Sequence, residues 1–317
     1  LQSKPYYQIA FGYGVIMPNY NLPPRTSITI EGLDRIPDNQ PVVFALNHTD
    51  RYNYFPFQYK LWREGFPRYT STWVKGKYYE NAFLKWFFDH TNNIPLPSIG
   101  YLITKDFLGL HNRKPKDAEY RQLRDHVDGD LPLEDIELTD DLAEVVDPSQ
   151  RTFPGQQPSY RQYIHHRNER LMKLVEERTL ETLYEKNNNL IVFPEGTRSV
   201  RLGTLRTGLS QFALKHRLPV VPVGSNGSDR VYTGNLPIAR GGSIVYRAGD
   251  PMTVEEDFAD LNPPRDYQPF TREASQYSEI FREATDRIGD RLNNLLDPRH
   301  QRETHQQEEG TSPDRLA

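Results

Sequence analysis

The segment Phe193-Pro194-Glu195-Gly196-Thr197-Arg198-Ser199 continues directly from the apolar run Leu190-Ile191-Val192. Such a run is typical of a buried strand, and α/β proteins bind ligands where their strands end. Arg198 carries a planar, permanently charged guanidinium that suits a phosphate or a carboxylate. The segment therefore predicts an anion-binding turn at the edge of a sheet.

A second polar segment, Asn47-His48-Thr49-Asp50-Arg51-Tyr52-Asn53, follows the strand-like run Val42-Val43-Phe44-Ala45-Leu46. An imidazole titrates near neutral pH, so His48 can accept a proton from a hydroxyl group. The two segments together predict a general base beside an anion clamp.

In these segments the chain resembles the glycerolipid acyltransferase family, which includes glycerol-3-phosphate and 1-acyl-glycerol-3-phosphate acyltransferases. The family carries an Asn-His-x4-Asp motif, then a Phe-Pro-Glu-Gly-Thr-Arg-Ser motif, then a strand with a proline, matched here by Val220-Val221-Pro222-Val223. The resemblance covers roughly residues 28 to 250 and implies direct attack by the bound alcohol, without an acyl-enzyme. It also implies a role in acceptor binding for the motif residues Glu195, Gly196, Thr197, Arg198 and Ser199.

The chain departs from the family pattern at Asn53, where the family has an aspartate that orients the histidine. Three interpretations are open: Asn53 accepts from His48 through its amide oxygen, Asp50 takes over the orienting role, or Asn53 is the N-cap of a helix with Pro56 in its first turn. The family's intermediate block is reduced to residues 92–98 and lacks its arginine. Lys75 and Lys77 could supply the missing cation or could be solvated surface lysines.

Composition narrows the class of protein. The chain has 317 residues and no cysteine, which excludes disulfides, thiolate metal sites and a cysteine nucleophile. Its mean hydropathy is −0.76 and it has no apolar window of about 18 residues, so we expect any membrane contact to be peripheral. A net charge of −4 without a basic stripe argues against nucleic acid. His165 and His166 are adjacent on an expected helix and point apart, so we expect no metal site.

The order of strand-like and helical patterns predicts an α/β fold with a mixed, mainly parallel central sheet and helices on both faces. We expect an N-terminal strap over residues 1–27, without a sustained helical period, and a single acyltransferase-like domain over residues 28–295. Residues 106–158 are acidic and proline-rich and are expected to form an insertion, part flexible and part short helix, that serves as a lid or docks a partner. Residues 296–317 are expected to be a disordered tail.

The sequence thus predicts an O-acyltransferase of phospholipid biosynthesis. The acyl group would come from acyl-CoA or acyl-carrier protein as co-substrate, no cofactor would be needed, and the acceptor would be a glycerophosphate or a lysophospholipid. The protein would be cytoplasmic and peripherally associated with a membrane surface. The alternative is a catalytically impaired relative that acts as a lipid-binding or scaffold protein.

Overall fold

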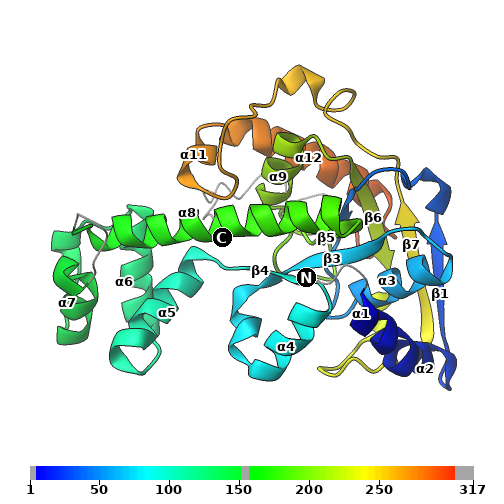
Figure 1. The fold of residues 1–317 in the computed structure, drawn as a ribbon, viewed down its shortest axis with the longest axis horizontal. Helices are drawn as coiled ribbons and strands as arrows, with labels where there is room; N and C mark the ends of the chain where they lie inside the picture. The colour runs from blue at the N-terminus through cyan, green and yellow to red at the C-terminus, as the bar shows by residue number, and fades with distance from the viewer. Residues whose placement is uncertain (1–4, 151–156, 304–317) are drawn as a thin grey trace.

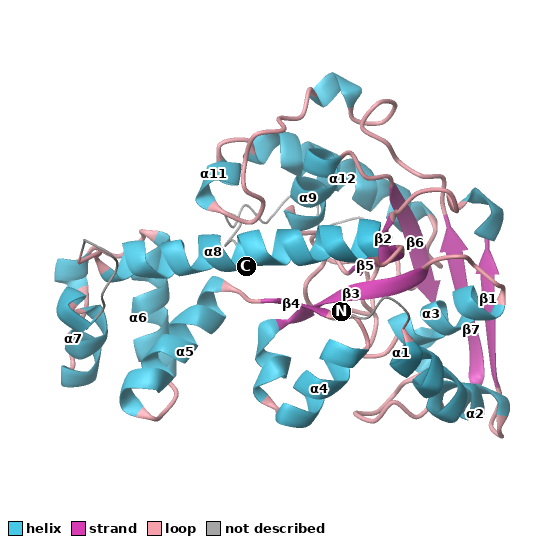
Figure 2. Cartoon of the chain, viewed as in Figure 1, coloured by secondary structure: helices cyan, strands magenta, loops and turns pink. Residues whose placement is uncertain are grey.

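A central sheet dominates the computed structural model, which describes residues 5–150 and 157–303. Within these residues the sheet has seven strands in the order β1-β7-β6-β2-β5-β3-β4 (Figures 1 and 2). Every neighbouring pair is parallel except β6 and β7. The mixed, mainly parallel sheet confirms the expected fold class. The strands are β1 Thr26–Glu31, β2 Val43–Leu46, β3 Tyr69–Lys75, β4 Ile94–Leu96, β5 Asn188–Val192, β6 Val220–Asn226 and β7 Gly242–Ala248.

The central strands are apolar throughout because helices cover both faces of the sheet. In β2, Val43 and Ala45 pack into one layer, with α9 (Gly208–His216) and α12 (Ser278–Asn294). Phe44 and Leu46 alternate into the opposite layer, with α3 (Tyr54–Arg63). The two layers form the main hydrophobic core.

The N-terminal segment is helical, which corrects the expectation of an irregular strap. It consists of α1 (Tyr6–Phe11), a π-helical turn (Gly12–Ile16) and α2 (Met17–Asn21). Ile16 and Tyr20 are buried in the layer that contains α3. This tertiary burial stabilises a helix that the glycine- and proline-containing sequence does not favour by itself. Residues 1–4 of the expected strap lie outside the described residues.

Most of the described part of the acidic insertion forms a helical lobe. The lobe begins at Ile99, before the expected boundary at residue 106, and its prolines at 115, 132 and 148 lie outside the long helices. Its elements are α5 (Ile99–His111), α6 (Asp117–Asp128), a 3-10 turn (Leu133–Asp135), α7 (Asp140–Val146) and a second 3-10 turn (Pro148–Gln150). It has a hydrophobic core of its own, shared with the start of α8 (Tyr160–Leu180). Figure 1 shows it at the far end of α8 from β1 and β7. Residues 151–156 lie outside the described residues.

The helix expected at His165 and His166 is present as α8, with Ser159 as its N-cap. The Ser159 hydroxyl accepts from the Gln162 backbone N–H and the Gln162 side chain accepts from the Ser159 N–H, which is a complete capping box. A π-helical turn (Glu181–Glu185) ends the helix before β5. The helix expected over residues 271–295 is divided into α11 (Arg272–Ser275) and α12. The remaining short elements are Leu33–Arg35, Gly76–Glu80, α4 (Ala82–His90), α10 (Ser228–Val231) and Ala259–Leu261.

The start of the expected disordered tail is packed against the domain. Leu296 and His300 are buried, and the His300 carbonyl accepts from the Leu202 N–H at 2.8 Å. The polar composition of this segment gave no sign that these two residues would be buried. Residues 304–317 lie outside the described residues. Among the described helices, none combines the length and the apolar character needed to cross a bilayer.

Candidate active site

The candidate site lies where the parallel strands β2, β5 and β3 end. His48 follows β2 by one residue, the turn that contains Arg198 follows β5, and Lys75 is the last residue of β3. Because β5 pairs with both β2 and β3, these three carboxyl ends lie at the same edge of the sheet. The two segments singled out in the sequence are therefore brought together.

His48 is held between the two segments by its own backbone. Its N–H donates to Glu195 Oε1 at 2.6 Å, and its carbonyl accepts from the Ser199 N–H at 2.9 Å. The imidazole stacks on the ring of Phe193. Burial lowers the pKa of His48 to about 4, against a smaller upward effect of the Asn53 side chain, and the nearby cations Arg198 and Lys75 lower it further. The ring is thus neutral and able to accept a proton at physiological pH.

Asn53 lies beside the His48 ring and is fully buried. Its Nδ2 donates to the Asn47 carbonyl at 2.7 Å. Within the described residues, His48 Nδ1 and Asn53 Oδ1 are both buried without a hydrogen-bond partner. Asn53 also occupies the N-cap position of α3, as one interpretation of the sequence anticipates, but its side chain makes no capping bond.

Asp50 makes its hydrogen bonds with neighbours other than His48. Its two carboxylate oxygens accept from the Tyr52 N–H at 2.8 Å and from the Thr49 hydroxyl at 3.0 Å. Burial raises the pKa of Asp50 in spite of these bonds. Of the two residues that could orient His48, the geometry thus favours Asn53.

Glu195 has a structural role in addition to the acceptor-binding role that the resemblance implies, which stays a prediction. Its carboxylate is buried and accepts from two backbone N–H groups, those of His48 at 2.6 Å and Gly203 at 2.8 Å. The carboxylate ties together the loops that follow β2 and β5. Gly196, the next residue, has φ of +65°, which a residue with a side chain rarely adopts, and this lets the chain turn outward.

The exposed part of the turn carries Thr197, Arg198 and Ser199. Within the described residues, Arg198 and the exposed Lys75 and Lys77 have no carboxylate partner among the salt bridges. Burial, then the neighbouring cations Lys77, Arg206 and Arg198, lowers the pKa of Lys75. Arg198, Lys75 and Lys77, which have no carboxylate among these salt bridges, thus form a candidate site for an anion.

Sequence reasoning missed two contributors to the site. Phe193 and Asn47 were considered only as members of the two motifs, without roles of their own. Asn47 is buried and its side chain makes two bonds to the backbone of Ser225 in β6. In the sequence, the only sign of the contact between Asn47 and Ser225 was that a polar residue stands directly before the histidine.

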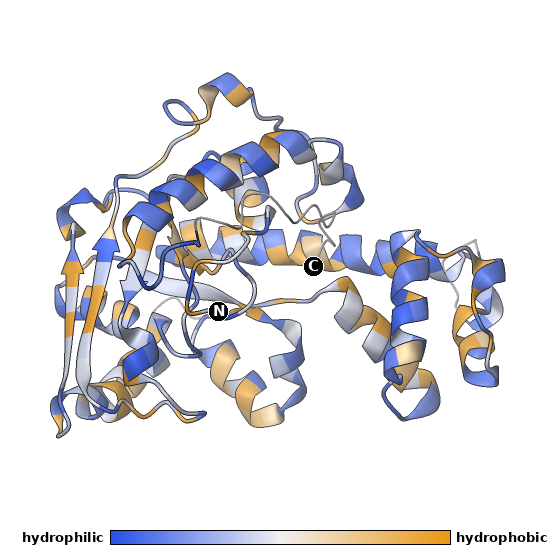
Figure 3. Cartoon of the chain, turned by 180° about the vertical axis from the view of Figure 1, so that it is seen from behind, coloured by the Kyte–Doolittle hydropathy of each residue, from blue (hydrophilic) through white to orange (hydrophobic). Residues whose placement is uncertain are grey.

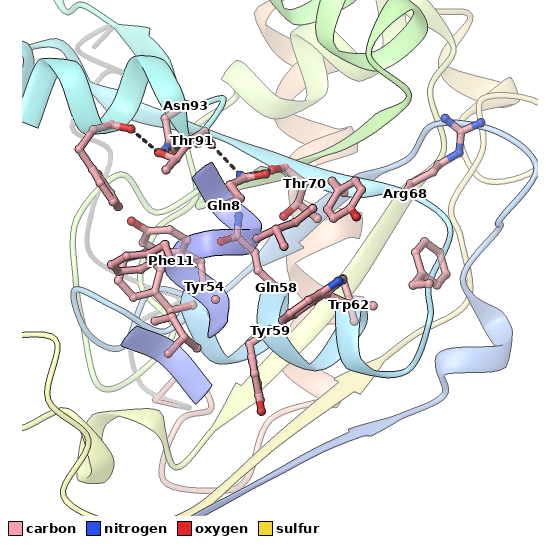
Figure 4. Close-up of a pocket in the computed structure, with 18 residues that line it drawn as sticks. Gln8, Phe11, Tyr54, Gln58, Tyr59, Trp62, Arg68, Thr70, Thr91 and Asn93 are labelled. Carbon is pink, nitrogen blue, oxygen red and sulfur yellow. Dashed lines mark hydrogen bonds between the residues drawn. The ribbon is translucent and has the colours of Figure 1, made fainter. Parts of the chain in front are cut away.

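An apolar pocket lies beside the site, between α1, α3 and the end of α4 (Figure 4). Phe11, Tyr54 and Trp62 contribute aromatic rings to it, and Gln8 closes one side by donating to the carbonyls of Thr70 and Thr91. The Tyr54 ring also contacts Phe193, with centroids 6.2 Å apart. The Tyr54 ring of the pocket wall and the Phe193 ring therefore lie between the pocket and the imidazole of His48. The described residues contain no group of three or more side chains arranged to hold a metal ion.

Comparison with known proteins agrees with this geometry. Residues 147–226 match the protein family described as Acyltransferase, a span that includes the turn after β5. The chain is similar to a 1-acyl-sn-glycerol-3-phosphate acyltransferase of Cocos nucifera, with 35% identity over 74 residues, which cover 23% of this chain and 24% of that protein. The match thus spans about a quarter of that relative. Both matches are to acyltransferases, the class of protein that the motifs of this chain resemble.

Among solved structures, the chain is similar to the crystal structure of the 1-acyl-sn-glycerophosphate (LPA) acyltransferase PlsC from Thermotoga maritima. That similarity has a TM-score of 0.44 and 14% sequence identity, and it covers 90% of this chain and 79% of that chain.

Proposed function

We propose that this protein is an O-acyltransferase that moves a fatty acyl group from acyl-CoA or acyl-carrier protein to a hydroxyl group of a glycerophosphate or lysophospholipid. The observation that carries the proposal is a neutral imidazole, His48, at the same sheet edge as the unpaired cations Arg198 and Lys75. A neutral imidazole accepts the hydroxyl proton, and the cations bind the phosphate that marks this class of acceptor.

The reaction proceeds by direct attack. His48 Nε2 takes the proton of the acceptor hydroxyl while the oxygen bonds to the thioester carbonyl carbon. The tetrahedral intermediate then breaks its carbon–sulfur bond, and the imidazolium returns the proton to the thiolate, so that the products are an ester and a free thiol. Asn53 Oδ1, which is buried without a hydrogen-bond partner, would accept from Nδ1–H and supply hydrogen bonding without a counter-charge.

The apolar pocket beside Phe193 is the proposed site for the acyl chain. Its aromatic lining excludes water and favours a hydrocarbon chain. The contacts from Tyr54 in the pocket wall to Phe193 and from Phe193 to His48 support this proposal, in which a chain seated in the pocket has its thioester end toward the imidazole.

The proposed membrane contact is a set of exposed apolar side chains on α1 and α4. Tyr7 packs edge-on against Trp86, with centroids 5.6 Å apart, and the neighbouring Phe83 is 69% exposed. Figure 3 shows the hydrophobic segments along α4. Aromatic side chains of this kind favour the headgroup region of a bilayer, which supports peripheral association at a cytoplasmic membrane face. The lobe of α5 to α7 stays a proposed lid or partner-docking element.

The rival function is lipid binding without turnover. Asn53 supports it, because an amide does not neutralise the imidazolium that forms during catalysis. The deciding experiment identifies co-purifying lipid by mass spectrometry and then measures thiol release in a single turnover with the deacylated lipid as acceptor. We expect turnover that His48→Ala abolishes while lipid binding and the thermal melting curve are kept. Lipid binding with background turnover in both proteins would establish the rival function instead.

A further inference from the structure

The Asn47 side chain is fixed at both ends. Its Oδ1 accepts from the Ser225 N–H at 2.7 Å, and its Nδ2 donates to the Ser225 carbonyl at 3.1 Å. These bonds continue the pairing of β2 with β6 beyond Leu46, where the strand itself ends. The backbone carbonyl of Asn47 is therefore held in a defined direction at the start of the His48 loop.

That carbonyl decides how the Asn53 amide is turned. An amide has one donor end and one acceptor end, and the Asn47 carbonyl can only accept. The bond from Asn53 Nδ2 to Asn47 O, at 2.7 Å, therefore fixes the donor end, which leaves Oδ1 for the His48 ring. The Asn53 backbone is anchored as well, because its carbonyl accepts from the Tyr246 hydroxyl of β7. The upward effect of Asn53 on the pKa of His48 has the sign expected when the amide oxygen accepts from an imidazole N–H.

We propose that Asn47 is a positioning residue that makes asparagine work in place of aspartate: its carbonyl turns the Asn53 amide so that Oδ1 selects the Nδ1–H tautomer of His48. The consequence for rate rests on the proposed role of His48 as base, whereas the tautomer itself does not. In the Ser-His-Asp triad, replacing aspartate by asparagine lowers kcat about 10⁴-fold because the tautomer is wrong. Here the donor end of the amide is already bound, and it cannot face the imidazole without breaking that bond.

The arrangement also gives a reason for the residue at position 53. An aspartate there would direct its second oxygen at the Asn47 carbonyl, and neither oxygen atom could donate. A buried carboxylate oxygen that faces a carbonyl oxygen forms no hydrogen bond with it, and this contact is unfavourable. Asn47 and Asn53 thus act together, because the orientation of the Asn53 amide depends on the Asn47 carbonyl.

The test is nitrogen-15 NMR on protein with labelled histidine, which distinguishes the two tautomers without any turnover. The His48 signals are assigned by their loss in His48→Gln. We expect Nδ1 of His48 to be protonated and Nε2 to be free in the parent. Asn53→Leu, which removes the acceptor, is expected to shift His48 toward the Nε2–H tautomer, and Asn47→Ala is expected to do the same through a freed amide.

Asp50→Asn is the matched control in the same loop and is expected to leave the His48 tautomer unchanged, because Asp50 does not contact the ring. If Asn47→Ala unfolds the loop, Asn53→Leu alone decides. A parent in the Nε2–H form, or the parent tautomer retained in Asn53→Leu, would overturn the proposal. If the parent turns over acyl donor, Asn47→Ala should lower kcat about 100-fold, the lower range for general base catalysis, at nearly unchanged acceptor KM. A rise in KM alone would contradict positioning.

Discussion

The imidazole of His48 lies against the ring of Phe193, with centroids 4.2 Å apart and an angle of 23° between the planes. Phe193 is the first residue after β5, so the motif that follows this strand contributes a surface to the base as well as a cation to the acceptor. The apolar face removes water from the imidazole, which penalises its charged form. Burial is accordingly the main reason that the pKa of His48 is low.

The low pKa predicts activity that persists in acid. Catalysis needs neutral His48, and protonation occurs only as the pH falls toward about 4 rather than 6.5. We therefore expect kcat/KM to stay level down to about pH 5 and to fall below it. Steady-state rates in buffers from acid to neutral pH measure this acid limb of the pH–rate profile, where kcat/KM falls as the pH is lowered. A midpoint of the fall near pH 6.5 would show that the ring is solvated.

Position 53 supplies the matched variants for this measurement. Asn53→Asp places a negative charge beside the imidazole, so it should raise the pKa of His48 and move the acid limb upward by about one unit. Asp50→Asn should leave the limb in place, because the Asp50 oxygens bond to Tyr52 and Thr49. An acid limb that responds to Asp50→Asn and not to Asn53→Asp would identify Asp50 as the orienting residue.

Arg198 should discriminate between acceptors by charge. Arg198→Ala is expected to raise KM about tenfold for a phosphate-bearing acceptor and little for a neutral one, since a charge-assisted contact is lost. Arg201→Ala is the control, because Arg201 is three residues away and pairs with Glu303. Acceptor KM values for lysophosphatidate and monoacylglycerol give the comparison. Equal effects on both acceptors would exclude a phosphate contact.

Membrane binding should depend on α4. The double variant Phe83→Ser and Trp86→Ser is expected to weaken binding to vesicles about tenfold or more, because two exposed aromatic side chains no longer enter the interface. Leu174→Ser on α8 removes an equally accessible apolar side chain, 52% exposed, and should have no effect. Cosedimentation with anionic vesicles at low salt measures binding, and undiminished binding of the double variant would place the contact elsewhere.

The pocket should set the length of the acyl chain that the protein accepts. Gly12 lines it, and a Cβ at this position would lie 3.2 Å from the Trp62 ring. Gly12→Leu is therefore expected to reduce turnover of long-chain donors more than that of short-chain donors. Gly14→Leu lies in the same helical turn with open space around it and serves as the control. An equal loss for all chain lengths would indicate that the acyl chain binds outside this pocket.

The sequence predicts the central strands well because each is an apolar run bounded by turn residues. Strand β7 was missed, although Ile244, Tyr246 and Ala248 are buried at alternate positions. The helical N-terminus was missed because its stability comes from contacts such as the bond between the Tyr20 and Tyr232 hydroxyls, which join distant parts of the chain.

At the site, the position of His48 was predictable, whereas the direction of the Asn53 amide was not. That direction depends on Asn47 and, through it, on Ser225, which is 178 residues away. The two backbone bonds of Glu195 were equally hidden, because a glutamate in a binding motif has the same sequence signature whether it faces a ligand or supports a turn.

The pairing of β1 with β7 has a consequence for how the protein is made. Glu31 and Arg247 form a register pair, and their side chains meet across the pairing although they are 216 residues apart. At translation rates of 5–20 residues per second, β1 leaves the ribosome about 10 to 40 s before its partner strand is synthesised. During that interval the nascent chain presents a strand edge with unsatisfied backbone groups, which can pair with other chains. Completion of this side of the sheet is therefore a late event in synthesis, which comes only after nearly the whole chain has been made.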